Sequence, residues 1–143
     1  MRVTGLKEAN DALMGMKAAT ARGVVRRVLT AAADPIAKDM ADRAPRDSGY
    51  LADHIDTGIR LSRRQAKVSR KESDVEVYAG ATRVDQAVYQ EFGTVDQPAQ
   101  PFARPAYEGG KYQALDDIKT GLGVEIKKTA ERAARKAARL ARV

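Results

Sequence analysis

The single histidine, His54, is the residue of this sequence best suited to act as a general base near neutral pH, and it lies between Asp53 and Asp56. A histidine beside a carboxylate is the pairing that general acid–base catalysis uses. The sequence has no second histidine and no cysteine that could complete a metal site or supply a thiol nucleophile. We therefore interpret His54 as a turn histidine with incidental acidic neighbours, and a hydrolase built around it is the least favoured hypothesis.

Two further patterns could carry chemistry. Asp116 and Asp117 form a carboxylate pair, but successive residues of a helix point about 100° apart and cannot share one site. Gly121-Leu122-Gly123 lacks the third glycine of a dinucleotide-binding fingerprint and follows no strand. The sequence therefore predicts a protein that is not an enzyme, with no catalytic residue, no bound metal and no cofactor.

The length and hydropathy of the chain limit its class. A chain of 143 residues predicts a single domain over 1–143. No apolar run approaches the roughly 18 residues of a spanning helix, and the N-terminus lacks the apolar core of a signal peptide. We expect a soluble protein, made in the cytoplasm, that does not contact a membrane.

Positive charge is concentrated at the C-terminus. Residues 127–143 carry seven basic side chains and one acidic one, a net charge of +6, whereas the other 126 residues carry 19 basic and 18 acidic ones. This favours a neutral body with a charged arm over a generally basic nucleic-acid-binding domain. A second basic segment, 63–72, is expected to be a long hairpin tip or mobile loop, poorly ordered in isolation. The side chains expected to face DNA or a partner are Arg63, Arg64, Lys67, Arg70, Lys71, Arg132, Arg135 and Arg139.

Three helices are predicted from apolar residues at steps of three and four. The first has Leu6, Ala9, Leu13 and Met16, with Thr4 as a candidate N-cap. The second has Val25, Val28, Ala32, Ile36 and Met40; Pro35 either kinks it or restarts it, and Pro45 ends it. The third is one long C-terminal helix, in which Gly121 and Gly123 are weak points, with an apolar stripe made by Leu115, Ile118, Leu122, Ile126, Ala130, Ala133, Ala137 and Leu140.

Alternating apolar residues predict two strands, one around Ile59 and Leu61 and one over Val75, Val77 and Ala79. A short helix over 85–92 follows them. The order of elements indicates an α+β fold, a small antiparallel sheet packed against the N-terminal helices and one long C-terminal helix. Turn chemistry before the sheet marks a candidate structural motif made by Pro45, Asp47, Ser48, Gly49 and Leu51.

A stiff connector joins the sheet to the last helix. It holds three of the five prolines, at 98, 101 and 105, and both phenylalanines, Phe92 and Phe102. We expect it to stay extended as far as Tyr107, to be anchored by its buried rings, and to place Gly93 in a backbone geometry that suits glycine. Residues 98–101 also match the proline-rich pattern that aromatic grooves bind, but a stiff connector is the favoured interpretation. The expected structural or interface residues are Tyr89, Phe92, Gly93, Thr94, Pro101, Phe102, Arg104 and Pro105.

Three segments, in order, resemble a known family. Arg43-Ala44-Pro45 followed by Asp47-Ser48-Gly49-Tyr50-Leu51 is similar to its Ala-Pro and Asp-(Thr/Ser)-Gly-x-Leu turn. Tyr89-Gln90-Glu91-Phe92-Gly93-Thr94 resembles its Tyr-x-x-Phe-Gly-Thr segment, and Gln100-Pro101-Phe102-Ala103-Arg104-Pro105-Ala106 its Gln-Pro-Phe-x-Arg-Pro-Ala segment. The family is that of the neck or tail-component proteins of double-stranded DNA phages with long non-contractile tails and of related prophages. Tyr50 and Pro35 depart from the family pattern, and Pro35 puts one continuous N-terminal helix in doubt.

The resemblance implies a non-catalytic virion protein in the joint between head and tail. It implies an oligomeric ring, of six or twelve copies, between the head-closure protein and the tail terminator or tail-tube protein. The basic C-terminal arm then faces either a neighbouring subunit or packaged DNA, and its apolar stripe favours the neighbour. The competing hypothesis is a nucleic-acid-associated protein of non-virion origin.

Overall fold

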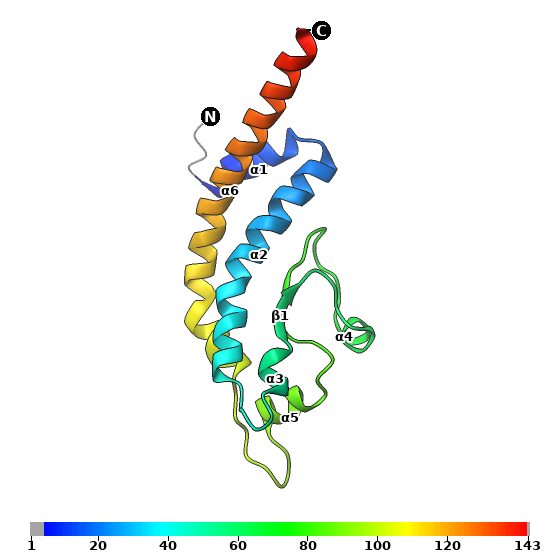
Figure 1. Cartoon of the computed structure of the whole chain (residues 1–143), viewed down its shortest axis with the longest axis vertical. Coiled ribbons are helices and arrows are strands. Elements are labelled where there is room, and N and C mark those ends of the chain that lie inside the picture. The colour runs from blue at the N-terminus through cyan, green and yellow to red at the C-terminus, as the bar shows by residue number, and fades with distance from the viewer. Residues whose placement is uncertain (1–4, 143) are drawn as a thin grey trace.

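Two long antiparallel helices form the main body of the protein, and a small sheet packs beside them (Figure 1). The computed structural model describes residues 5–142. Its elements are α1 (Leu6–Met14), α2 (Ala18–Arg43), α3 (Tyr50–Asp53), β1 (Ile55–Gly58), α4 (Arg63–Val68), β2 (Tyr78–Ala81), α5 (Gln86–Phe92) and α6 (Ala103–Ala141). The predicted α+β class, with a small antiparallel sheet and one long C-terminal helix, is confirmed.

The two long helices approach each other closely because α6 places glycines opposite branched side chains of α2. An ideal Cβ on Gly110 would lie 2.8 Å from Cγ1 of Ile36, and one on Gly121 would lie 3.1 Å from Cγ1 of Val28. Gly121, expected to be a weak point, is therefore a packing contact. An ion pair between Arg27 Nε and Glu125 Oε2, at 3.1 Å, also joins the two helices.

Neighbouring glycines of α6 offer a direct test of this close approach. Gly110→Ala is expected to destabilise the protein by about 1–3 kcal/mol, because the new methyl group overpacks against Ile36. Gly109→Ala is expected to stabilise it by about 0.5–1 kcal/mol, because a Cβ there meets nothing within 4 Å and alanine favours helix. Urea unfolding of the two variants measures the difference. Equal stabilities would contradict the packing.

Helix α2 runs without a break through Pro35, which settles the alternative that the sequence left open. Both Pro35 and Ala31, whose carbonyl loses its hydrogen bond to the proline, lie on the exposed side, where water can satisfy that carbonyl. The helix ends at Arg43, two residues before Pro45, as predicted. Its inner face is formed by Val24, Val28, Ala32, Ile36, Ala37 and Met40. The candidate N-cap of the first helix, Thr4, lies outside the described residues.

Both strands lie farther from the tip of the hairpin than the sequence predicts. β1 pairs antiparallel with β2, with Ile55 opposite Ala81 and Gly58 opposite Tyr78. Ile59 and Leu61 follow β1, and Val75 and Val77 precede β2, so the predicted centres of both strands are wrong. The sheet forms where it packs against α2, a tight contact that favours small residues, and both Ala79 and Ala81 pack against the core there.

The basic segment 63–72 is not the loop that the sequence suggested, because its first six residues form α4. A reciprocal capping box begins this helix: the Gln65 backbone N–H donates to Ser62 Oγ at 3.3 Å, and the Ser62 N–H donates to Gln65 Oε1 at 3.1 Å. The Ser-x-x-Gln pattern was present in the sequence and could have identified the helix. The basic side chains of α4 are all exposed.

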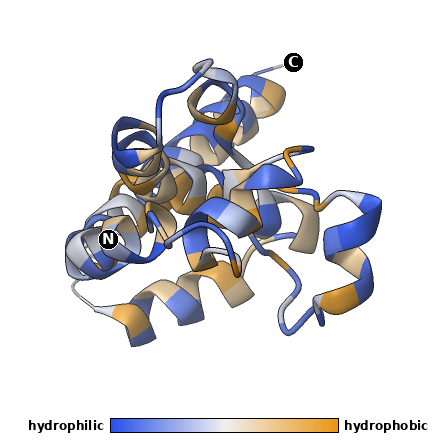
Figure 2. Cartoon of the chain, turned by 90° about the horizontal axis from the view of Figure 1, so that it is seen from below, coloured by the Kyte–Doolittle hydropathy of each residue, from blue (hydrophilic) through white to orange (hydrophobic). Residues whose placement is uncertain are grey.

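Two apolar clusters hold the body together. One joins the C-terminal half of α2 to α3, β1 and the first turn of α6, and it contains Met40, Leu51, Ile55 and Phe102. The other joins α1, the N-terminal half of α2 and the middle of α6, with Val24 and Ile126 fully buried in it. Seen from below, the ribbons carry many hydrophilic residues on their outer sides (Figure 2).

Candidate functional site

The segment after α5 forms a rigid loop, 93–101, fixed by backbone hydrogen bonds at its base. The Gly93 N–H donates to the Tyr89 carbonyl at 2.8 Å, and the Thr94 N–H donates to the Gln97 carbonyl at 2.8 Å. The Gln100 N–H donates to the Gln90 carbonyl at 2.7 Å and so closes the loop against α5. These bonds, with Pro98 and Pro101, hold the loop in one shape.

Gly93 makes this loop possible. Its φ of 74° and ψ of 177° belong to a region that only glycine adopts readily. An ideal Cβ would lie 2.7 Å from the Ala99 nitrogen and 2.9 Å from the Gln97 oxygen, which are both backbone atoms. The expectation of a glycine-specific geometry at Gly93 is therefore confirmed.

Glu91 binds the start of α6. Its carboxylate accepts hydrogen bonds from the backbone N–H groups of Phe102 at 2.8 Å, Ala103 at 2.9 Å and Arg104 at 3.0 Å. These are N–H groups at the beginning of a helix, which have no partner within the helix and favour a negative charge. Burial alone would raise the pKa of Glu91, but the three donors and the charge of Arg104 outweigh it and lower the pKa below its usual value.

Replacing Glu91 by glutamine is expected to lower the free energy of unfolding by about 1–3 kcal/mol at pH 7. Because the folded pKa of Glu91 is lowered, the advantage of the carboxylate is full above about pH 4.5, the ordinary pKa of glutamate. It is lost as the pH falls through the folded value. Urea unfolding of both proteins from pH 7 to pH 3 measures the gap, which should narrow on acidification.

The matched control for this prediction is Glu108→Gln, which removes an exposed carboxylate that pairs with Lys111 on the surface of α6. It should change stability by less than about 1 kcal/mol at pH 7. A gap between wild type and Glu91→Gln that stays constant with pH would show that the carboxylate charge does not hold α6.

The aromatic rings of the connector are not all anchors. Phe102 is buried, with 2% of its surface exposed, but Phe92 is 66% exposed. Tyr89 and Tyr107 are also exposed, so the predicted burial of the aromatic residues holds only for Phe102. The extended segment ends earlier than predicted as well, because α6 begins at Ala103 and contains Pro105 in its first turn, where a helix tolerates proline.

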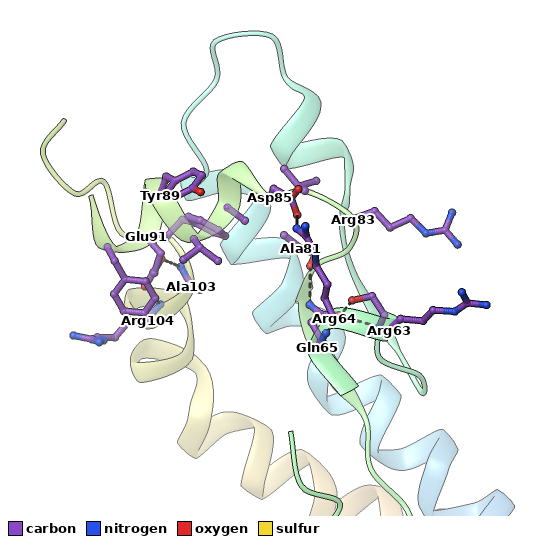
Figure 3. Close-up of a pocket in the computed structure, with 16 residues that line it drawn as sticks. Arg63, Arg64, Gln65, Ala81, Arg83, Asp85, Tyr89, Glu91, Ala103 and Arg104 are labelled. Carbon is purple, nitrogen blue, oxygen red and sulfur yellow. Dashed lines mark hydrogen bonds and ion pairs between the residues drawn. The ribbon is translucent and has the colours of Figure 1, made fainter. Parts of the chain in front are cut away.

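The exposed side of α5 forms one wall of a groove of about 930 Å³. Val88 and Phe92 of α5 supply apolar surface, which we call the floor of the groove. The other wall is formed by α4 and the end of β2, and the start of α6 closes one end. Arginines lie on two sides of the groove: Arg63 and Arg83 are on one side with their side chains pointing outward, and Arg104 is on the other side near Glu91 (Figure 3). The Arg104 guanidinium lies 5.9 Å from the centre of the Phe92 ring, a cation–π contact. We call this the basic-rimmed groove.

Two contacts fix α4 in the groove: one reaches across to the start of α5, and the other joins α4 to the end of β2 within the same wall. Arg64 Nη1 lies 2.6 Å from Asp85 Oδ1, and the Gln65 side-chain amide donates to the Ala81 carbonyl at 3.3 Å (Figure 3). Arg83 has a φ of 61°, which is unusual for a residue other than glycine. Such backbone strain is typical of functional positions, and sequence reasoning missed both Arg83 and the role of Glu91.

The structure brings two of the sequence motifs together. A smaller cavity of about 390 Å³ on another side of α5 is lined by Pro45, Asp47, Ser48, Gly49 and Leu51 of the turn motif and by Tyr89, Thr94 and Gln97. Gly49 has a φ of 77°, and Ser48 Oγ accepts a hydrogen bond from the Tyr50 N–H at 3.3 Å. Leu51 is buried in the core. The turn motif therefore lies beside α5, on a different side of this helix from the basic-rimmed groove.

Comparison with known proteins connects these motifs to a family. A family model described as "Bacteriophage HK97-gp10, putative tail-component" matches residues 7–93, which is more than half of the chain. The chain belongs to this family. Neither the curated proteins nor the solved structures gave a match. The protein is thus a structural component of a phage particle, as the resemblance implied.

The family match covers part of the candidate site. It begins at the second residue of α1, includes α2 to α5, the turn motif and Glu91, and ends at Gly93. The loop after Gly93 and the whole of α6 follow the matched segment. The third motif, 100–106, thus lies outside the match, although the structure places it against the second motif through Glu91.

The predicted basic residues lie in two separate places. Arg63 and Arg64 line the basic-rimmed groove, with Lys67, Arg70 and Lys71 exposed nearby in sequence. Arg132, Arg135 and Arg139 lie at the far end of α6, which projects beyond α1 and α2 (Figure 1). No helix within the described part of the chain has both the length and the apolar character needed to cross a bilayer.

His54 contacts Tyr50 rather than the neighbouring aspartates. Its Nδ1 atom lies 2.7 Å from the Tyr50 carbonyl oxygen, and the two rings are 4.0 Å apart between centres. Across residues 5–142, no cluster of three or more histidine or acidic side chains is arranged to hold a metal ion. These contacts fit the interpretation of His54 as a turn residue.

Proposed function

We propose that this phage protein forms a ring in the joint between head and tail. Six or twelve copies stack between the head-closure protein on one side and the tail terminator or tail-tube protein on the other. The family match supports a structural tail component, and the neck position is our extension of it.

One observation supports the proposal most directly: the elongated molecule has two different candidate contact elements, one at each end. The basic end of α6 projects at one end, and the rigid loop 93–101 projects at the other (Figure 1). A subunit placed with its long axis roughly along the tail would then offer the basic end of α6 to an adjacent ring and the loop end to its neighbours within its own ring. A rigid helical body keeps that spacing constant.

A phage carrying a nonsense mutation in the gene tests this role. In a non-suppressing host we expect DNA-filled heads and separate tails by electron microscopy, with few joined particles. Supplying the protein from a plasmid should restore joining. A reconstruction of the wild-type virion that contains no density for this protein in the neck or tail would contradict the proposal.

The basic end of α6 is expected to bind a neighbouring protein rather than DNA. Residues 130–142 are exposed along the whole helix, including the apolar stripe of Ala133, Ala137 and Leu140. An isolated helical segment with such a narrow stripe is marginally stable and gains from a partner. DNA would use only the charges, through its phosphates, whereas a protein partner would use the stripe as well.

Two sets of substitutions separate these partners. We expect Ala133→Asp with Ala137→Asp to abolish particle assembly, and Arg132, Arg135 and Arg139 changed together to glutamine to reduce it only slightly. Plaque counts and electron microscopy of complemented nonsense phage measure the outcome. The opposite pattern, with charges essential and the stripe dispensable, would show that the arm contacts DNA.

The alternative function, a nucleic-acid-associated protein of non-virion origin, draws on the same exposed basic helix. Genes for a portal, capsid and tail tube beside this gene would favour the virion role. Their absence, together with salt-sensitive DNA binding by the purified protein, would favour the alternative.

A further inference from the structure

We propose that loop 93–101 of one copy binds in the basic-rimmed groove of the next copy, and that this contact builds the ring. Val95 would lie against the apolar floor formed by Val88 and Phe92. Asp96 would pair with the arginines of the rim. The inference rests on the proposed ring function and names the surfaces that form it.

The composition of the groove is that of a protein interface. Its floor exposes large apolar side chains, with Val88 59% and Phe92 66% exposed. Its rim carries Arg63, Arg64, Arg83 and Arg104 and no lysine. Aromatic residues and arginine are enriched at the centres of protein interfaces, whereas lysine is depleted. A groove that bound only DNA phosphates would not need the apolar floor.

The groove carries a net positive charge, because its lining has four arginines and two acidic residues, and both acidic groups are already engaged. Asp85 pairs with Arg64, and Glu91 accepts three hydrogen bonds from the start of α6. Within residues 5–142, neither Arg63 nor Arg83 forms an ion pair. An occupant with a carboxylate beside an apolar side chain therefore complements the groove.

Loop 93–101 has this chemistry in a fixed shape. Val95 is fully exposed, and Asp96, also exposed, is the loop's single charged residue. The hydrogen bonds at the base of the loop and the prolines 98 and 101 fix it before it binds. A preorganised loop loses little conformational entropy on binding, which increases affinity for a given contact area.

The two surfaces lie on different sides of α5, which favours a contact between copies over one within a single chain. The base of the loop, at Thr94 and Gln97, lines the smaller cavity with the turn motif, whereas the groove lies on another side of α5. The bond between Gln100 and Gln90 holds the loop there. A contact between two different surfaces of identical subunits is head-to-tail, and it closes into a ring when the rotation per subunit allows it.

Cross-linking tests the contact directly, because the chain contains no cysteine. Val95→Cys and Val88→Cys proteins are purified separately, mixed at high concentration and treated with a short bifunctional maleimide. Both positions are exposed, so the substitutions should leave the fold intact. We expect cross-linked dimers in the mixture and few with either protein alone, and a ladder of oligomers from the double variant.

The matched control is Met14→Cys, an exposed position on α1 far along the rod from the groove. Mixed with Val95→Cys, it should give at least tenfold less dimer. A second test uses charge: Asp96→Arg should weaken self-association about tenfold or more, and adding Arg83→Asp in the same chain should restore part of it. Sedimentation measures both.

Two results would overturn the contact. One is a Val95–Val88 cross-link no stronger than the Met14 control, and the other is unchanged self-association of Asp96→Arg. If closed rings still appear by electron microscopy in that case, the ring function stands and another surface builds it. If the protein is also absent from the neck of the virion, the proposed function fails independently.

Discussion

Replacing Phe102 by alanine is expected to lower the free energy of unfolding by about 3–5 kcal/mol, because the ring is almost fully buried in the cluster that joins α2 to the start of α6. This is a large part of the 5–15 kcal/mol that stabilises a typical domain. Urea unfolding followed by circular dichroism measures it, and the variant should melt well below the wild type.

Phe92→Ala is the matched control, because it removes the same ring from an exposed position. We expect it to change stability by less than about 1 kcal/mol while weakening self-association, since Phe92 forms part of the groove floor. If both substitutions destabilise the fold equally, Phe92 is buried in solution and the groove is closed.

Replacing Gly93 by valine is expected to destabilise the protein by about 3 kcal/mol or more. The side chain would both force a glycine-only backbone conformation and collide with backbone atoms of Gln97 and Ala99, which cannot rotate away. The expected local result is that the loop opens and Glu91 loses its fixed position relative to α6.

Gly109→Val is the control for this second prediction, since a Cβ at Gly109 meets nothing within 4 Å. Its stability should stay within about 1 kcal/mol of the wild type. Hydrogen exchange of the Phe102 and Ala103 amides reports on the loop directly, and it should increase in Gly93→Val alone. Unchanged exchange in both variants would show that the loop does not depend on Gly93.

The sequence predicted the long elements well, because their signals are local and repeated. The helical stripes placed α1, α2 and α6, and the predicted helix 85–92 is confirmed as α5. The family was recognised from three short motifs that mark turns and helix starts. The first two each contain a glycine with a positive φ, Gly49 and Gly93, a residue type that can be recognised before the fold is known.

The parts that sequence reasoning misplaced depend on contacts between distant segments. Strand positions were wrong because the packing of Ala79 and Ala81 against the core, and not the valines before them, determines where the hairpin pairs. The exposure of Phe92 follows from which side of α5 faces the core, and seven residues are too few to reveal this. The sequence does not distinguish Glu91 from the other glutamates, because its role depends on the start of α6 lying beside it in the fold.

The glycines of α6 fix more than a close approach. Gly110 lies opposite Ile36 and Gly121 opposite Val28, so a slip by one turn would bring larger side chains into both contacts. This sets the register of α6 along α2, and with it the length of helix beyond the body. The last 15 residues of α6, 127–141, extend about 22 Å at roughly 1.5 Å per residue, and one turn of slippage would change that reach by about 5.4 Å. The same two glycines would therefore set the distance at which the basic arm reaches the partner that we propose for it.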